Sequence, residues 1–250
     1  MKALITGASS GIGRDMARIL STKGFELWLA ARRTDRLEEL KDTLPYPAHV
    51  LGADLSRAEA CQELYGRLKD EQLDLVINNA GFGLFGTFAE TDLERDLAMI
   101  DTNIRAVHIL TKLFLQDFKS RNQGAILNVS SSAGFFAGPL LSTYYATKSY
   151  VLRLTEAIHE ELRRDGSAVY IGVFCPGPVR TEFDNVANVR FSVRGLTSEQ
   201  AAHFAIEGME KGKMIIMPGL LMKLARFGER FVPEQLMLRL SYHMQDRKNG

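Results

Sequence analysis

Tyr144 and Lys148 are four residues apart and therefore share one face of a predicted helix. A free tyrosine has a pKa of about 10, and a neighbouring ammonium group lowers that pKa by stabilising the phenolate. Such a tyrosine can protonate an alkoxide that hydride addition leaves on a carbonyl carbon, or remove that proton in the reverse reaction. The adjacent Tyr145 is three residues from Lys148, so we predict that Tyr144 is the acid and base.

Three consecutive serines, Ser130 to Ser132, follow a short apolar run that we interpret as a strand. A hydroxyl at this point can donate a hydrogen bond to a carbonyl oxygen as negative charge develops there. Residues alternate between the two faces of a strand, so Ser130 is expected to point away from Ser131. The run itself leaves open which serine acts.

A glycine-rich turn, Thr6 to Gly13, lies between the first predicted strand and a helix, with the spacing Gly-x3-Gly-x-Gly. Glycines let the backbone turn tightly beside a diphosphate, and the helix N-terminus offers free N–H groups and partial positive charge. We therefore expect a dinucleotide to contact Gly7, Ser9, Ser10, Gly11, Ile12 and Gly13.

The second predicted strand ends with Ala31, where a site for NAD would carry an acidic residue to bind the ribose. Arg32 and Arg33 follow it, and guanidinium groups suit a 2′-phosphate. This pattern predicts NADP(H), although the two arginines would also suit the exposed start of a helix.

Taken in order, the motifs of residues 1–185 resemble those of the short-chain dehydrogenase/reductase family, in its single-domain, NADP(H)-preferring subgroup. The turn from Thr6 to Gly13 resembles its TGxxxGxG motif, and residues 78–81 resemble its NNAG motif. Ser131, Tyr144 and Lys148 match its catalytic serine and YxxxK motif with the family's thirteen-residue spacing, which favours Ser131 over its neighbours.

The resemblance also implies the roles of further residues. Asn103 falls at the family's helix asparagine, where it would hold a water in a proton relay, and Lys148 would bind the nicotinamide ribose. Asp54 and Leu55 would touch the adenine, while Val179 and Thr181 would hold the nicotinamide carboxamide. The implied cofactor-binding set outside the glycine turn and the two arginines is Asp54, Leu55, Asn79, Ala80, Gly81, Tyr144, Lys148, Pro176, Gly177, Val179 and Thr181.

Short apolar runs alternate with amphipathic stretches, which predicts an α/β protein with a doubly wound parallel sheet, Rossmann-like, and helices on both faces. Such a sheet binds its ligand where the carboxyl ends of the strands meet, and the motifs follow the strands as this requires. We expect strands near residues 3–5, 25–31, 49–51, 73–77, 125–129, 168–174 and 214–217. We expect helices near residues 12–23, 35–43, 58–69, 92–99, 105–118 and 145–163.

Composition narrows the class of protein. Hydrophobic residues make up 46% and charged residues 24%, which is typical of a globular chain. We interpret residues 1–250 as one dinucleotide-binding and catalytic domain, with residues 219–250 as a helical C-terminal tail. The net charge of +1 argues against nucleic-acid binding, and two cysteines cannot supply a four-ligand zinc site. With no cleavable signal and no apolar run of about 18 residues, we expect a cytoplasmic protein.

The motifs are followed by apolar residues that would line a substrate pocket: Phe82, Phe135, Phe136, Leu140, Leu141 and Phe183. They favour a lipophilic carbonyl substrate, although the same residues would also suit a core. Residues 184–200 have the length of a lid, with Thr197 or Ser198 beginning a helix.

The tail carries two apolar stripes at helical spacing, the first with Leu220, Leu224, Phe227 and Phe231, the second with Leu236, Met237, Leu240 and Met244. Residues 211–250 hold eight Lys or Arg and three Asp or Glu. This pattern suits packing on the domain or on a second subunit, and less favourably a membrane surface. The resemblance implies pairing through the helices near 105–118 and 145–163, hence a homodimer or homotetramer.

The sequence therefore predicts an NADP(H)-dependent oxidoreductase that transfers a hydride between nicotinamide and a ketone or secondary alcohol, with a small-molecule substrate. A non-catalytic NADP(H) sensor and a membrane-surface interaction protein are the alternatives. The complete set of Ser131, Tyr144 and Lys148 argues against the sensor, which needs no acid.

Overall fold

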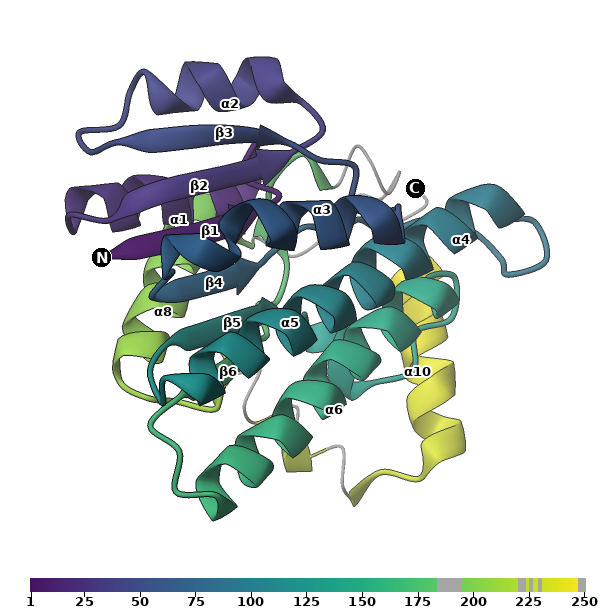
Figure 1. Cartoon of the computed structure of the whole chain (residues 1–250). Coiled ribbons are helices and arrows are strands. Elements are labelled where there is room, and N and C mark those ends of the chain that lie inside the picture. The colour runs from purple at the N-terminus through teal and green to yellow at the C-terminus, as the bar shows by residue number, and fades with distance from the viewer. Residues whose placement is uncertain (184–194, 220–223, 225–226, 229–230, 247–250) are drawn as a thin grey trace.

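Seven parallel strands form the central sheet of this computed structural model, which describes residues 1–183, 195–219, 224, 227–228 and 231–246 (Figure 1). The strand order is β3-β2-β1-β4-β5-β6-β9. The bounds of these strands are β1 Lys2–Thr6, β2 Glu26–Ala31, β3 Ala48–Gly52, β4 Leu75–Asn78, β5 Ala125–Val129, β6 Tyr170–Phe174 and β9 Ile215–Ile216. The predicted doubly wound parallel sheet is confirmed, and the run near 214–217 is its seventh strand.

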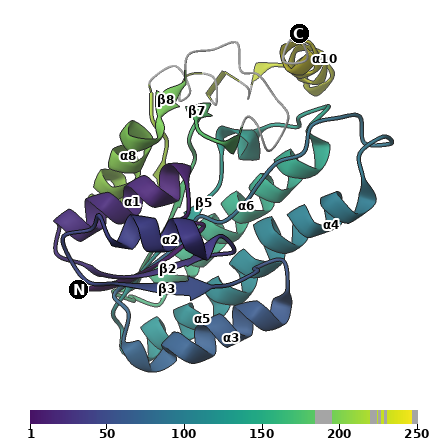
Figure 2. The ribbon, with the colours of Figure 1, turned by 90° about the horizontal axis from the view of Figure 1, so that it is seen from above.

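Helices cover both faces of the sheet (Figure 2). One layer contains α1 (Gly11–Thr22), α2 (Thr34–Lys41) and α8 (Ser198–Glu210). The other contains α3 (Ala58–Leu68), α5 (Ala106–Ser120) and α6 (Ser142–Arg164). Helix α4 (Leu93–Ile100) runs into α5 through a π-helical turn at Asp101–Arg105.

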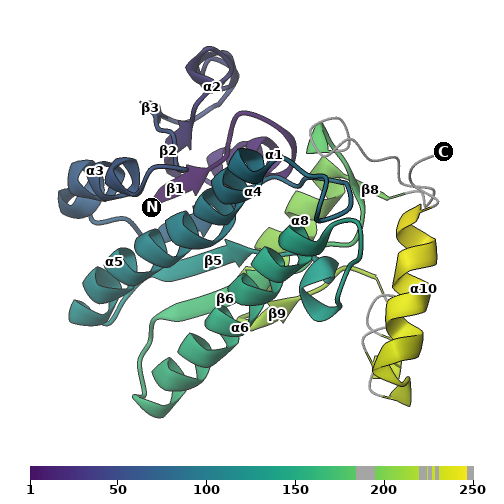
Figure 3. The same cartoon turned by 90° about the vertical axis from the view of Figure 1, so that its right-hand side faces the viewer.

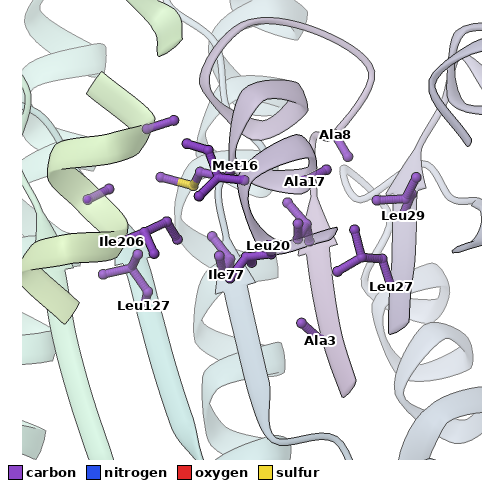
Figure 4. Packing of buried hydrophobic residues seen from close by; sticks show 14 of the residues in the cluster. Ala3, Ala8, Met16, Ala17, Leu20, Leu27, Leu29, Ile77, Leu127 and Ile206 are labelled. Atoms are coloured by element: carbon purple, nitrogen blue, oxygen red, sulfur yellow. The ribbon is translucent and has the colours of Figure 1, made fainter. Parts of the chain in front are cut away.

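The strands are apolar throughout because both of their faces are buried. In β1, Ala3 and Ile5 contribute to the core under α1 and α8, whereas Leu4 contributes to the core on the opposite face. Figure 4 shows Met16 and Leu20 of α1 lying over the strands that carry Ile77 and Leu127. This packing fixes the carboxyl ends of β1, β4 and β5 along one edge.

Two features that bear on the site have no counterpart among the predicted elements. The π-helical turn interrupts what the sequence suggests are two simple helices, and it carries Asn103. A second, two-stranded sheet pairs β7 (Val179–Arg180) with β8 (Leu196–Thr197). Thr197 then caps α8, accepting a hydrogen bond from the backbone N–H of Gln200 at 3.1 Å. Of the predicted lid, residues 184–194 lie outside the described residues.

The described part of the tail includes α10 (Glu234–Asp246), which stands beside the carboxyl edge of the sheet (Figure 3). Ser241 Oγ donates to the carbonyl oxygen of Ala137 at 3.0 Å, and the side-chain amide of Gln245 donates to the hydroxyl of Tyr145. Helix α10 therefore packs on its own chain. Leu220 and the side chain of Met244 lie outside the described part, as do most residues between 220 and 230. No helix among the described residues is long and apolar enough to cross a membrane.

Candidate active site

A cleft of about 440 Å³ opens at the carboxyl edge of the sheet. It gathers side chains and backbone from the ends of β1, β2, β4, β5 and β6, as the topology requires. All but two of the predicted site residues line it, namely Gly7, Ser9, Ser10, Gly11, Ile12, Arg32, Arg33, Asp54, Leu55, Asn79, Ala80, Gly81, Ser131, Tyr144, Lys148, Pro176, Gly177, Val179 and Thr181. The exceptions, Gly13 and Asn103, lie behind the lining.

Lys148 projects from α6 and is only 5% exposed. Its Nζ donates to the carbonyl oxygen of Val129, at the end of β5, at 3.0 Å. Burial disfavours the ammonium ion and lowers the pKa of Lys148 to about 8. The amine is therefore largely charged at neutral pH and loses its proton under mildly alkaline conditions.

Tyr144 stands one turn before Lys148 on α6, and the Lys148 Nζ lies 5.8 Å from the centre of its ring. The pKa of Tyr144 is raised, because burial penalises the phenolate more than a hydrogen bond with Ser131 stabilises it. The sequence argument that Lys148 lowers this pKa is wrong for the chain by itself. The Lys148 ammonium group donates to the carbonyl oxygen of Val129 and does not pair with the Tyr144 hydroxyl. Burial therefore has the largest effect on the pKa of Tyr144.

All three serines of the run line the cleft, but Ser130 and Ser131 make different hydrogen bonds. Ser130 Oγ is buried and donates to the carbonyl oxygen of Lys148 at 2.7 Å. Ser131 has an extended backbone, and its Oγ accepts a hydrogen bond from the N–H of Ala133 at 3.1 Å. Tyr144 forms its hydrogen bond with Ser131, whereas the Ser130 hydroxyl is engaged by the Lys148 carbonyl, as the alternation along the strand predicts.

Asn103 is fully buried in the π-helical turn. Its Nδ2 donates to the carbonyl oxygen of Phe82 at 2.9 Å and to Thr147 Oγ1 at 3.0 Å. Its Oδ1 accepts from the N–H of Phe82 at 3.1 Å. The side chain therefore ties the segment after β4 to the first turns of α6, which carry Tyr144 and Lys148.

The glycine turn fits a dinucleotide. Gly7 and Gly11 have φ values of +67° and +55°, which side chains rarely allow, and Ser10 caps α1 without a side-chain hydrogen bond to its N–H groups. A Cβ on Gly13 would lie 2.6 Å from the carbonyl oxygen of Gly7. Asn79 closes the turn from β4, because its Nδ2 donates to that same oxygen at 3.2 Å.

Arg33 extends from the end of β2 toward this turn. One of its nitrogens, Nη2, donates to the hydroxyls of Ser9 and Ser10 at 3.2 and 3.0 Å. The other, Nη1, pairs with Glu182 at 2.9 Å. Arg36 pairs with the same carboxylate at 2.5 Å. The sequence analysis does not predict that Arg36 and Glu182 belong to the site. The one signal in the sequence is that Arg36 follows Arg33 by three residues, about one helical turn.

Residues 1–190, about three quarters of the sequence, match the family described as short chain dehydrogenase. The chain belongs to this family. A short-chain dehydrogenase is an oxidoreductase that transfers hydride with a nicotinamide cofactor, and the cleft fits such a cofactor.

Relatives agree with this assignment. The short-chain dehydrogenase is 33% identical over 190 residues to the NADP-dependent 3-hydroxy acid dehydrogenase YdfG of Escherichia coli, covering 74% of this chain and 76% of that protein. Its fold resembles a short-chain dehydrogenase from Sphingobium yanoikuyae solved with NADPH, with TM-score 0.82, 30% identity and coverage of 94% and 96%. It also resembles a bulky-bulky ketone specific alcohol dehydrogenase from Comamonas testosteroni, with TM-score 0.78, 26% identity and coverage of 94% and 95%.

The predicted apolar pocket of this short-chain dehydrogenase is divided between cleft and core. Phe82, Leu141 and Phe183 line the cleft, and the Phe183 ring centre lies 5.2 Å from that of Tyr144. Phe135 and Leu140 are instead buried outside the lining, and Phe136 packs on the cluster that contains Phe135. The core interpretation therefore holds for these three.

Proposed function

We propose that this chain is an NADP(H)-dependent reductase that converts a lipophilic ketone to a secondary alcohol. The observation that carries this proposal is the meeting of Ser131, Tyr144 and Lys148 in one cleft, beside a glycine turn with an open helix N-terminus. An enzyme needs this acid at the substrate, whereas a sensor does not.

When bound, the nicotinamide supplies the hydride for reduction or accepts it in the reverse reaction. Ser131 donates a hydrogen bond to the carbonyl oxygen and stabilises its developing charge. Tyr144 then delivers its proton to that oxygen. Its raised pKa suits reduction, because the phenol stays protonated at neutral pH.

The chain offers a separate set of groups for each part of NADP(H). The glycine turn and the N-terminus of α1 hold the diphosphate, Asp54 and Leu55 hold the adenine, and Arg32 and Arg33 hold the 2′-phosphate. Lys148 holds the nicotinamide ribose. Asn79, Ala80, Gly81, Pro176, Gly177, Val179 and Thr181 complete the proposed set. The NADPH complex of the Sphingobium yanoikuyae protein and the NADP dependence in the name of the Escherichia coli protein support this choice.

A lipophilic substrate follows from the walls around Tyr144. Phe82, Leu141 and Phe183 supply apolar surface, whereas the described cations of the cleft, Arg32, Arg33 and Lys148, belong to the proposed cofactor side. The resemblance to an alcohol dehydrogenase specific for bulky-bulky ketones also supports a lipophilic substrate.

The test is oxidation of NADPH against a panel of ketones, from short ketones to 3-oxoacyl thioesters and steroids. Tyr144→Phe should lower kcat by about 10²-fold or more, because it removes the proton donor, while NADPH binding is retained. Tyr145→Phe is the matched control, since the Tyr145 hydroxyl pairs with Gln245 on α10. Full activity of the Tyr144 variant would refute the assignment. Tight NADPH binding without turnover on any ketone would instead favour the sensor.

A further inference from the structure

Glu182 places a carboxylate between two arginines at the rim of the cleft. Its Oε2 accepts from Arg33 Nη1 at 2.9 Å, and its Oε1 accepts from Arg36 Nη1 at 2.5 Å. Each carboxylate oxygen therefore has a guanidinium partner of its own. These partners lie 149 and 146 residues away along the chain, so only the fold brings the three charges together.

The surroundings of this carboxylate have the chemistry of a phosphate site. Arg33 also contacts the hydroxyls of Ser9 and Ser10, which belong to the glycine turn. Two guanidinium groups and two hydroxyls are the donors that bind phosphate oxygens, and guanidinium groups take carboxylates and phosphates with the same paired geometry. Their position beside the end of β2 is where the 2′-phosphate of a dinucleotide would be read.

We propose that Glu182 is an internal competitor for the 2′-phosphate of NADP(H) and thereby sets how strongly the chain prefers NADP(H) to NAD(H). The inference rests on the proposed function, because it takes the arginines to be the phosphate site. A 2′-phosphate approaching Arg33 and Arg36 must displace the carboxylate or share the arginines with it, and the two anions repel each other. NADH carries no such phosphate, so its binding leaves the pairs intact.

The electrostatics make the size of this effect moderate. The side chains of Arg33, Arg36 and Glu182 are 44%, 39% and 43% exposed, so water and salt screen their attraction. The arginines lower the pKa of Glu182, which keeps the carboxylate charged at neutral pH. Competition therefore operates across the neutral range and weakens as salt is added.

The experiment is a binding titration of the full chain with NADPH and NADH, followed by isothermal calorimetry or by nicotinamide fluorescence. Glu182→Gln should tighten NADPH binding by about three- to tenfold and leave NADH binding unchanged. The adenosine fragments 2′,5′-ADP and 5′-AMP should show the same contrast, since only the first has the 2′-phosphate. Raising the salt concentration should shrink the gain.

Glu160→Gln is the matched control. Glu160 also bridges two arginines, Arg163 and Arg164, at 2.7 and 3.0 Å, at the far end of α6. Glu160→Gln changes the net charge by the same amount as Glu182→Gln and should leave the affinities for NADPH and NADH unchanged.

Three results would overturn the inference: an unchanged ratio of NADPH to NADH affinity in Glu182→Gln, equal tightening of both ligands, or weaker NADPH binding. The last would show that Glu182 orients the arginines. Failure of the proposed cofactor is distinguishable, because NADH would then bind more tightly than NADPH to both the wild-type chain and Glu182→Gln.

Discussion

At the scale of single residues, burial controls the proton affinity of Tyr144 and Lys148, which line the cleft. It raises the pKa of Tyr144 and lowers that of Lys148 to about 8, so in each case the neutral form is favoured. The site therefore holds a protonated phenol beside an amine that is still mostly charged at neutral pH. That combination favours donation of a proton over its removal.

Alcohol oxidation should consequently depend steeply on pH. Between about pH 6 and 8, kcat/KM for the alcohol should rise roughly tenfold per unit, because the phenolate that acts as base is scarce below its raised pKa. Ketone reduction should change little up to about pH 7, since Tyr144 stays protonated and Lys148 stays largely charged until the pH approaches its pKa of about 8. Initial rates in both directions measure this, and a plateau in oxidation beginning below pH 7 would show that the base has a lower pKa.

Residue types and spacing suffice to nominate Tyr144 and Lys148, because their positions on one helix follow from local geometry. They also place a serine at the end of a strand, but only the spacing of the family singles out Ser131 among its neighbours. Glu182 and Arg36 are different. Their pairing depends on how a segment after β7 returns to the start of α2, and no local pattern encodes that return.

At the scale of elements, hydrophobic periodicity is a strong signal for the long helices and for strands buried on both faces, and the main sheet was predictable for that reason. Two-residue strands such as β7 and β8 have no periodicity to detect. The π-helical turn at Asp101–Arg105 also leaves no detectable signal in the sequence, since one widened turn barely changes the apolar pattern of the helices on either side.

Two glycines in helices should respond oppositely to alanine. Gly13→Ala should destabilise the chain by about 1–3 kcal/mol and weaken NADPH binding, because the new methyl group would meet the Gly7 carbonyl oxygen at 2.6 Å. Gly66→Ala, in α3, has nothing within 4 Å of the added carbon and should stabilise by about 0.5–1 kcal/mol. Urea unfolding measures both, and a Gly13 variant as stable as the wild type would contradict the close packing.

At the scale of the whole molecule, α10 docks through an unusual face. Ser241 and Gln245 are buried against the body, whereas Leu236 and Leu240 are 49% and 48% exposed. Residues two apart on a helix differ by about 200° in direction, so Arg239 and His243 face away from the body. The outward surface of α10 is therefore mixed, because Leu236, Leu238, Leu240 and Tyr242 are exposed beside these polar residues.

Because hydrogen bonds from Ser241 and Gln245 hold α10 on its own chain, we expect the full chain to stay in the supernatant when sedimented with anionic lipid vesicles. An interfacial helix needs a continuous apolar face, whereas the outward side of α10 mixes Leu236 and Leu240 with Arg239 and His243. A chain ending at Gly219 is the comparison. Lipid-dependent sedimentation of the full chain, absent from the shortened one, would restore the membrane hypothesis for the tail.

The hydrogen bonds of Asn103 have a thermodynamic consequence for ligand binding. They join the backbone at Phe82 to Thr147, so contacts within the chain itself hold the floor of the cleft together. Association then loses little conformational entropy in ordering Tyr144 and Lys148, and more of the contact energy remains as affinity. A preformed floor of this kind also suits rapid exchange of oxidised for reduced cofactor, because neither has to rebuild the catalytic groups on entry.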